Sequence, residues 1–262
     1  MAGNSRDPGR SVTARALSVL TAFDVEHTRL TLTAIARRAA IPLATAHRLV
    51  RELEMWGALT RDGDGRYAIG LRLWEIGLLA PVNSSLREVA LPFLQDLCAS
   101  THDNVHLAVR DELAAVYVEK LSTPRAVPIL SRTGGRLPLH ATGVGKVLLA
   151  HAPASVVQEC CERGLARRTP YTITEPGRLN QELHAVRTRG FARANEEMTL
   201  GNCSVAVPVL DATGEVIAAL GIVAHSVRAD VAKLVKPLFP AAEGIRQRLL
   251  EHERAGHDAV SR

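Results

Sequence analysis

Aromatic residues are scarce in this chain. Phe, Trp and Tyr make up 3% of its 262 residues, although apolar residues account for 47%. The cores must therefore be built from Ala, Val and Leu, and a protein that binds single-stranded nucleic acid by stacking bases on aromatic rings is disfavoured. Long apolar runs are also missing. Because no stretch of about 18 apolar residues occurs, the sequence predicts no membrane span.

Cysteine is rare too, and the four cysteines are not spaced like metal ligands. They are Cys98, Cys160, Cys161 and Cys203. None belongs to a C-x-x-C pair, so no metal site is indicated, and we expect buried free thiols in a reducing cytoplasm. The N-terminal stretch MAGNSRDPGRS lacks the apolar segment of a signal peptide. The sequence therefore predicts a cytoplasmic protein without metal or cofactor.

Lysine is absent from residues 1–82, which nevertheless hold eleven arginines against eight acidic residues, a net charge of +3. The whole chain carries only +5. Affinity for nucleic acid would therefore have to come from a local patch. The sequence contains one, because no acidic residue interrupts residues 29–51.

Two short amphipathic patterns, separated by a three-residue break, coincide with this basic region. The first consists of Leu32, Ile35, Ala36 and Ala39, and the second of Ala46, Leu49, Val50 and Leu53. Each follows the i, i+3, i+4, i+7 spacing of one buried helix face. Pro42 suits the first turn of the second helix. A short helix, a tight turn and a basic second helix are typical of a helix-turn-helix. Spacing alone would fit two core helices of an ordinary helical domain equally well.

The next segment favours the DNA-binding interpretation. Residues 57–70 predict a β-hairpin, with strands at 58–61 and 66–69 around the turn Asp62-Gly63-Asp64-Gly65. A hairpin directly after a recognition helix makes a winged helix-turn-helix. We expect base edges to be contacted by Thr45, His47 and Arg48. We expect phosphates to be contacted by Arg37, Arg38, Arg51, Arg61 and Arg66.

The length predicts two domains. We expect a disordered arm at residues 1–11, a DNA-binding domain at 12–70, a linker helix at 71–82 and a second domain at 83–262. The linker is too apolar to lie free in water, so it would pack against a partner subunit or bridge the two domains.

The second domain is predicted to be α+β, because its strands and helices are segregated as well as alternating. Helices are expected at 86–100, 142–151, 153–163, 178–189 and, with interruptions at Pro237 and Pro240, 228–252. Strands are expected at 105–109, 115–119, 127–130, 203–210 and 216–224. Together they predict an antiparallel sheet flanked by helices, typical of a sensor domain.

The segment LPLHATGVGKVLLA at 137–150 looks like a phosphate loop but does not match one, because Val147 follows Lys146 where a hydroxyl residue is needed. Gly143 and Gly145 would let the backbone approach a neighbour closely. That neighbour is either packed protein or the carboxylate of a ligand at the helix N-terminus. Neither a G-x-S-x-G elbow nor an H-E-x-x-H motif occurs in the sequence.

Four segments together resemble the isocitrate lyase regulator (IclR) family of bacterial transcription factors. They are LTAIARRAAIPLATAHRLVRELEMWGAL, NVHLAVRDELAAVYVEKL, LPLHATGVGKVLLA and GFARANEEMTLGNCSVAVPVLDATGEVIAALGI. The resemblance extends over roughly residues 11–250. It implies an N-terminal winged helix-turn-helix, a linker helix used in dimerisation, and a C-terminal GAF-like domain that binds a small carboxylate or aromatic acid.

The chain departs from the family pattern in both expected domains. Ala40 occupies a turn position that is often Gly, which costs roughly 1–2 kcal/mol if the residue is left-handed. Ser204 and Cys203 stand where the family usually has Cys and Arg, and Ala194 replaces a frequent carboxylate. Gly221 and Val223 fall where two serines are often found. Fewer polar groups imply an effector less polar than the smallest keto acids.

We therefore expect a ligand-responsive transcriptional repressor or activator that is not an enzyme. It would act as a homodimer or dimer of dimers on double-stranded operator DNA and sense a small organic acid. The effector would contact Ile129, Thr142, Gly143, Val144, Cys203, Ser204, Gly221 and Val223. A small-ester or amide hydrolase is one alternative, against which the missing nucleophile motif argues. A sensor module that does not bind DNA is another, against which the clustered arginines and the wing argue.

Overall fold

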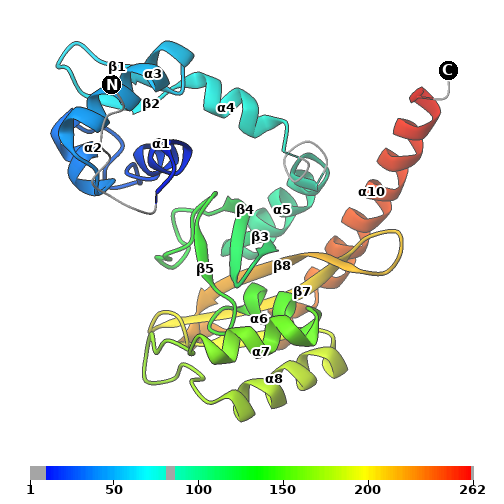
Figure 1. The fold of residues 1–262 in the computed structure, drawn as a ribbon. Coiled ribbons are helices and arrows are strands. Elements are labelled where there is room, and N and C mark those ends of the chain that lie inside the picture. Colours follow the sequence, from blue (N-terminus) through cyan, green and yellow to red (C-terminus); the bar gives the residue numbers. More distant parts are fainter. Residues whose placement is uncertain (1–9, 81–85, 261–262) are drawn as a thin grey trace. The chain divides into compact units, whose positions relative to one another are not determined.

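The computed structural model describes residues 10–80 and 86–260 and divides into two compact units between Ala80 and Pro81 (Figure 1). The first unit contains α1 (Val12–Leu20), α2 (Leu32–Arg38), α3 (Leu43–Trp56), β1 (Leu59–Arg61), β2 (Tyr67–Ile69) and α4 (Leu71–Leu78). Its core is formed by the apolar faces of α2 and α3 together with Val19, Leu59 and Tyr67. The predicted winged helix-turn-helix is confirmed.

The turn between α2 and α3 contains a strained residue. Ala40 has φ +52°, the left-handed conformation that Gly adopts more readily. The Ile41 N–H donates to the Ala36 carbonyl at 3.1 Å and closes the turn. Pro42 was expected in the first turn of the second helix. It lies one residue earlier, as the N-cap of α3, where its missing N–H is equally harmless.

The wing is tied to the helices by backbone hydrogen bonds. Strands β1 and β2 pair antiparallel, with Arg61 opposite Tyr67. Leu30 and Tyr67 exchange both backbone N–H···O bonds, at 2.9 and 2.7 Å, which adds a third short extended segment to the hairpin. At the tip, the Asp62 carboxylate accepts from the backbone N–H groups of Asp64 and Arg66. The hairpin therefore leaves α3 in a fixed direction.

Helix α4 ends at Leu78, four residues before the predicted end of the linker helix. The predicted residues 81 and 82 lie outside the described residues, as do residues 1–9 of the predicted N-terminal arm. Of that arm, Ser11 caps α1 by accepting from the Ala14 N–H, and Arg10 donates to the Ala39 carbonyl at 3.1 Å.

The second unit is built on a six-stranded antiparallel sheet in the order β5-β4-β3-β8-β7-β6. The strands are β3 (Asn104–Asp111), β4 (Ala114–Leu121), β5 (Arg136–Pro138), β6 (Ala192–Asn195), β7 (Asn202–Leu210) and β8 (Val216–His225). The strand predicted at 127–130 is wrong. That segment is a loop, because Pro124 and Pro128 cannot donate ladder hydrogen bonds there. Strands β5 and β6, both short, were not predicted.

Helices cover both faces of this sheet, as Figure 1 shows within the second unit. They are α5 (Glu88–Thr101), α6 (Gly143–Ala150), α7 (Ala154–Glu162), α8 (Pro176–Arg189), α9 (Val231–Val235) and α10 (Leu238–Val260), with a 3-10 turn at Ser226–Arg228. One core joins the sheet to α5 and α10, and the other joins it to α6, α7 and α8. The predicted α+β fold, an antiparallel sheet flanked by helices, is confirmed.

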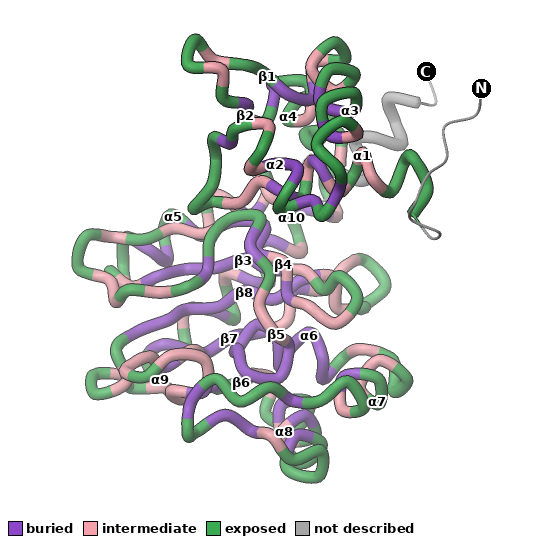
Figure 2. Tube along the Cα trace, turned by 60° about the vertical axis from the view of Figure 1, so that its left-hand side comes forward, coloured by how far each residue is buried: buried purple, intermediate pink, exposed green. Residues whose placement is uncertain are grey.

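Burial identifies the central element of the second unit (Figure 2). Every residue of α6 is buried, and β3, β7 and β8 are buried over most of their lengths. The N-terminus of α6 therefore points into the protein rather than into water. Gly145 lets this end of α6 pack closely against the preceding segment, because an added Cβ would lie 2.4 Å from the Leu139 carbonyl oxygen.

Candidate DNA-binding surface and ligand cavity

Helix α3 carries four of the eight predicted DNA contacts. Its buried residues are Ala46, Leu49 and Val50, so the opposite face is free for a ligand. His47, Arg48 and Arg51 are exposed on that face, whereas Thr45 is half-buried at its edge. This arrangement gives α3 a basic outer surface, on which no acid among the described residues pairs with Arg48 or Arg51.

Arg37 and Arg38, the two predicted phosphate contacts in α2, differ in their surroundings. Arg37 is exposed at the end of α2. The guanidinium of Arg38 instead donates to the Ala22 carbonyl at 2.6 Å and pairs with Asp24. Arg38 therefore fastens α2 to the end of α1 and is committed within the unit, which the helical pattern of the sequence did not reveal.

The wing arginines flank the hairpin as predicted from the turn. The Arg61 guanidinium lies 5.5 Å from the centre of the Tyr67 ring, and Arg66 is exposed on the other side of the tip. Nearby, Arg29 pairs with Asp62 at 3.4 Å. The wing therefore holds Arg61 in place, whereas the Arg66 side chain is exposed.

One arginine that sequence reasoning overlooked joins α3 to α4. The Arg72 guanidinium stacks 4.5 Å from the centre of the Trp56 ring and donates to the Trp56 carbonyl at 3.3 Å. Just before it, Gly70 is required by close packing, because an added Cβ would lie 2.2 Å from the Gly57 carbonyl oxygen. Helix α4 is thereby fixed to the end of the recognition helix.

The second unit contains a cavity beside the N-terminus of α6. It encloses about 420 Å³ that protein atoms do not fill, part of it open to solvent. It is lined by His106, Tyr117, Ile129, Leu130, Ser131, Leu137, Ala141, Thr142, Ala194, Glu197, Met198, Thr199, Asn202, Ser204 and Val223.

Four of the eight predicted effector residues line this cavity, namely Ile129, Thr142, Ser204 and Val223. The Thr142 hydroxyl also caps α6, accepting from the Gly145 N–H at 3.1 Å and donating to the Pro138 carbonyl at 3.1 Å. Its hydrogen-bonding capacity is therefore largely used within the protein.

The other four predicted residues lie elsewhere, each for a packing reason. Cys203 and Ser204 are neighbours in β7, so their side chains leave opposite faces of the sheet. Gly143 lies against the strand, because an added Cβ would be 2.4 Å from Ser204 Oγ. At Gly221 an added Cβ would meet Val144 Cγ1 at 2.9 Å, so these two residues pack against each other.

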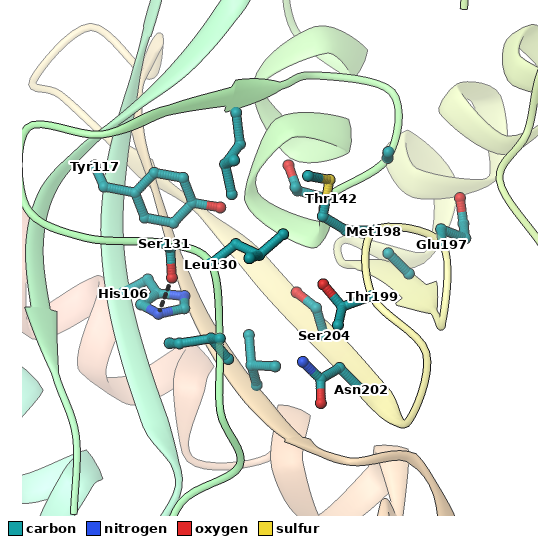
Figure 3. A pocket seen from close by; sticks show the side chains of 15 residues that line it. His106, Tyr117, Leu130, Ser131, Thr142, Glu197, Met198, Thr199, Asn202 and Ser204 are labelled. Atoms are coloured by element: carbon teal, nitrogen blue, oxygen red, sulfur yellow. Dashed lines mark hydrogen bonds between the residues drawn. The ribbon is translucent and has the colours of Figure 1, made fainter. Parts of the chain in front are cut away.

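Three polar residues that sequence reasoning missed meet on one side of the cavity (Figure 3). Ser131 Oγ and His106 Nε2 are 2.9 Å apart and buried. The Tyr117 ring packs edge-to-face on the imidazole, with centroids 5.1 Å apart. Burial lowers the pKa of His106 to about 3 and raises that of Tyr117, so both groups are neutral at physiological pH. In the sequence, the available signal for this polar site was a lone histidine within an apolar strand.

A buried ion pair supports the opposite wall. Lys146 is 1% exposed, and its ammonium donates to Glu197 Oε1 at 2.6 Å and to the Arg193 carbonyl at 3.0 Å. Burial raises the pKa of Glu197, and the charge of Lys146 opposes that shift. The pair links α6 to β6 and to the loop that follows it, and Met198 and Thr199 in this loop line the cavity.

Most of the surface that lines the cavity is apolar, and its polar side chains are five hydroxyls, one imidazole, one amide and one carboxylate. Among the described residues that line it, the only ionisable side chain expected to be charged at neutral pH is Glu197, which Lys146 balances. An anion would have to be held by hydroxyl, amide and backbone groups. Elsewhere in the described ranges no group of three His, Cys, Asp or Glu side chains is placed to bind a metal, and no helix is long and apolar enough to cross a membrane.

A winged helix-turn-helix with a basic recognition helix, joined to an α+β unit with a small-molecule cavity, defines a DNA-binding transcriptional regulator with a sensor domain. Comparison with known proteins agrees. Residues 12–63 match the IclR helix-turn-helix domain, and residues 80–246 match the bacterial transcriptional regulator IclR C-terminal domain. The chain belongs to the IclR family of transcriptional regulators and is not an enzyme.

Individual relatives extend over almost the whole chain. The p-hydroxybenzoate hydroxylase transcriptional activator of Acinetobacter baylyi is 34% identical over 87% of this chain and 86% of its own length. The regulator KdgR of Dickeya chrysanthemi is 31% identical over 90% of this chain and 81% of its own. The solved structure of an IclR homologue from Microbacterium hydrocarbonoxydans, complexed with 4-hydroxybenzoate, is 37% identical, with a TM-score of 0.88 over 92% of this chain and 100% of that one.

Proposed function

We propose that this regulator binds operator DNA as a homodimer, or as a dimer of dimers, and changes its operator occupancy when a small organic acid enters the cavity of the second unit. The observation that carries the proposal is the cavity itself, a largely apolar space with a few convergent polar groups at a buried helix N-terminus. In this scheme residues 12–70 bind DNA, the helix after them links the two domains, and the rest of the chain senses the effector.

On the DNA side, Arg48, with His47 and Thr45 beside it, would face base edges in the major groove. Arg37 and Arg51 would contact phosphates next to α3, and Arg61 and Arg66 would contact phosphates from the wing. We leave Arg38 out of this set, because it is engaged by Ala22 and Asp24.

On the effector side, the cavity suits a small aromatic monocarboxylate better than a compact keto acid. Its walls include Ile129, Leu137 and Val223, and no cation lines it among the described residues. Apolar walls favour a ring, and a single carboxylate can be held by Ser204, Asn202 and Thr199. The 4-hydroxybenzoate complex of the Microbacterium homologue makes benzoates the first compounds to test.

The test begins with selection of operator sequences from a pool of randomised duplexes by the purified full-length chain. Binding to the selected duplex is then titrated with and without benzoate and its hydroxylated derivatives. Coupling of about 1–3 kcal/mol would change the operator Kd by about 5- to 150-fold. The direction of that change on the native promoter decides between repression and activation. If no benzoate or other small organic acid alters operator affinity, the proposed sensing role is wrong.

A further inference from the structure

We propose that the Ser131–His106 pair recognises an uncharged hydroxyl group on the effector, so that the regulator selects a hydroxylated monocarboxylic acid over the same acid without the hydroxyl and over a dicarboxylate. This rests on the organic-acid sensing proposed above and adds the chemical group that distinguishes the effector from its relatives.

The pair is a built polar site within an apolar surrounding. Ser131 is 5% exposed and His106 is 2% exposed, and both line the cavity. Their mutual contact at 2.9 Å uses one donor and one acceptor. A serine hydroxyl has one donor and two acceptor positions, so Ser131 keeps capacity for a second partner whichever of the two atoms donates. A ligand hydroxyl can act as donor or acceptor and therefore fits either arrangement.

Leaving this capacity unused inside an apolar cavity is unfavourable. A buried hydroxyl that leaves hydrogen-bonding capacity unused carries a cost in free energy. A ligand that brings a hydroxyl recovers part of that cost, whereas a ligand with hydrogen at the same ring position leaves it in place. Because of this difference, a site that hydrogen-bonds a ligand hydroxyl rejects an analogue without the hydroxyl.

The neutrality of the pair excludes a second anion at this position. The Tyr117 ring stands edge-on to the imidazole, and both are enclosed by the sheet. Burial lowers the pKa of His106 to about 3, so the imidazole carries no charge that would attract a carboxylate. Lys120 is close enough to lower the pKa of His106 but does not line the cavity, so a dicarboxylate would have to bury its second charge here without a direct ion pair, which is much more costly than burying a hydroxyl.

The loop that carries Ser131 is held in place, so the hydroxyl is preorganised. Tyr117 of β4 exchanges backbone hydrogen bonds with the loop, accepting from the Gly134 N–H at 2.8 Å and donating to the Gly135 carbonyl at 3.0 Å. Farther along β4, Glu119 Oε1 accepts from the Thr133 hydroxyl at 3.3 Å. A ligand hydroxyl therefore meets a fixed partner and does not have to order one on binding.

Figure 3 shows where the rest of the ligand would lie. His106, Tyr117 and Ser131 stand on one side of the cavity, and Thr199, Asn202 and Ser204 stand on the other. We place the carboxylate on the second side, where hydroxyl and amide donors converge. The two ends of the ligand would then be recognised by separate groups, so that the contribution of each can be measured independently.

The experiment measures binding of benzoate, 3-hydroxybenzoate, 4-hydroxybenzoate and benzene-1,4-dicarboxylate to the full-length chain by titration calorimetry. We expect one hydroxybenzoate to bind at least about fivefold tighter than benzoate, the value of one neutral hydrogen bond, and the dicarboxylate to bind weakest. Ser131→Ala should remove the preference for the hydroxyl while leaving benzoate affinity nearly unchanged. His106→Phe, which keeps a ring against Tyr117, should have the same effect.

Thr199→Val serves as the matched control at the other end of the cavity. It should weaken benzoate and hydroxybenzoate equally and keep their ratio. The inference is overturned if the parent chain shows no preference for the hydroxyl, or if both Ser131→Ala and His106→Phe retain it. It is equally overturned if Ser131→Ala weakens benzoate and hydroxybenzoate by the same factor, since that indicates a purely structural role. Failure of every benzoate to bind refutes the aromatic-acid proposal itself and is distinguishable from equal binding of benzoate and its hydroxylated forms.

Discussion

Arg48 and Arg66 are two arginines that we expect to contribute differently to DNA binding. Arg48 is exposed on the outer face of α3, and Arg66 is exposed at the wing. If Arg48 contacts a base through both guanidinium arms, Arg48→Ala should weaken binding to the selected operator by about 1–3 kcal/mol and relax the preference at one base position. Arg66→Ala should weaken binding to all duplexes about equally and reduce the slope of log K against log salt by about one unit.

Gel-shift titrations of both variants at several salt concentrations check these expectations. Circular dichroism establishes that the variants are folded. Operator affinity equal to that of the parent in both variants would show that α3 is not the recognition helix.

His106 should make the folded chain sensitive to acid. Burial lowers the pKa of this imidazole to about 3 in the folded protein, against an ordinary histidine value of 6.5. Below pH 6.5 the unfolded chain takes up a proton that the folded chain does not, so stability falls as the pH falls from 6.5 towards 3. Between pH 7 and pH 5 this amounts to about 2 kcal/mol for one histidine.

Urea unfolding followed by circular dichroism at the two pH values tests this expectation. His106→Phe should remove that part of the pH dependence. Burial also lowers the pKa of His140. The parent and the variant both retain His140, so the difference in pH dependence between the two proteins isolates His106. Identical pH dependence in parent and variant would contradict a neutral, buried His106.

Among the elements, the turn of the helix-turn-helix stores strain that a single substitution should release. Ala40 is left-handed, so Ala40→Gly removes roughly 1–2 kcal/mol of strain and adds about 0.5–1 kcal/mol of backbone entropy cost. We expect a net stabilisation of the first unit of about 0.5–1 kcal/mol. Both tryptophans, Trp56 and Trp74, lie in this unit, so denaturation followed by tryptophan fluorescence reports on it selectively.

Ala39→Gly is the matched control for this prediction. Ala39 is buried and has helical dihedral angles, so glycine there adds entropy cost without relieving strain. This variant should destabilise the unit by about 1 kcal/mol. Equal effects of the two substitutions would indicate that the left-handed geometry at residue 40 carries no energetic cost.

The elements of the first unit could be predicted from the sequence because their signals are local. The apolar spacing of α2 and α3 and the Asp-Gly turn of the wing each lie within a few residues. The engagement of Arg38 could not be predicted, because Asp24 and the Ala22 carbonyl reach it from another helix end. An exposed position in a helical pattern does not reveal which partner occupies it.

The elements of the second unit were less predictable because both faces of the sheet are buried. Strand β7 reads NCSVAVPVL, in which apolar residues face both helical layers, so the alternation of apolar and polar residues could not show that Ser204 and Cys203 face different layers. The contributions of His106 and Ser131 depend on the pairing of distant segments, and neither residue lies in a recognisable motif. For the cavity, the sequence could therefore indicate the region around Thr142 but not the opposite wall.

At the scale of the whole molecule, α4 is the surface through which we expect the proposed homodimer to form. It has no buried residue within the described chain, and its Leu71, Trp74 and Ile76 are 67%, 60% and 47% exposed. Arg72 and Gly70 fix the direction in which it leaves α3. A rigid apolar helix attached to the recognition helix is suited to a two-fold interface, in which the same surface is used by both protomers.

We therefore expect Trp74→Glu to dissociate the proposed homodimer. A charge buried in an apolar interface is strongly unfavourable, so the dissociation constant should rise by at least about tenfold. Val25→Glu, which alters a similarly exposed apolar residue outside α4, should leave assembly unchanged. Sedimentation equilibrium at micromolar concentration measures both.

Because a dimer presents two recognition helices, the selected operator should be a palindrome with half-sites about 34 Å, or a multiple of that, apart. Trp74→Glu should then bind an isolated half-site like the parent but lose the gain in affinity on the full palindrome. A parent chain that is monomeric at these concentrations, or that selects a single unrepeated site, would contradict assembly through α4.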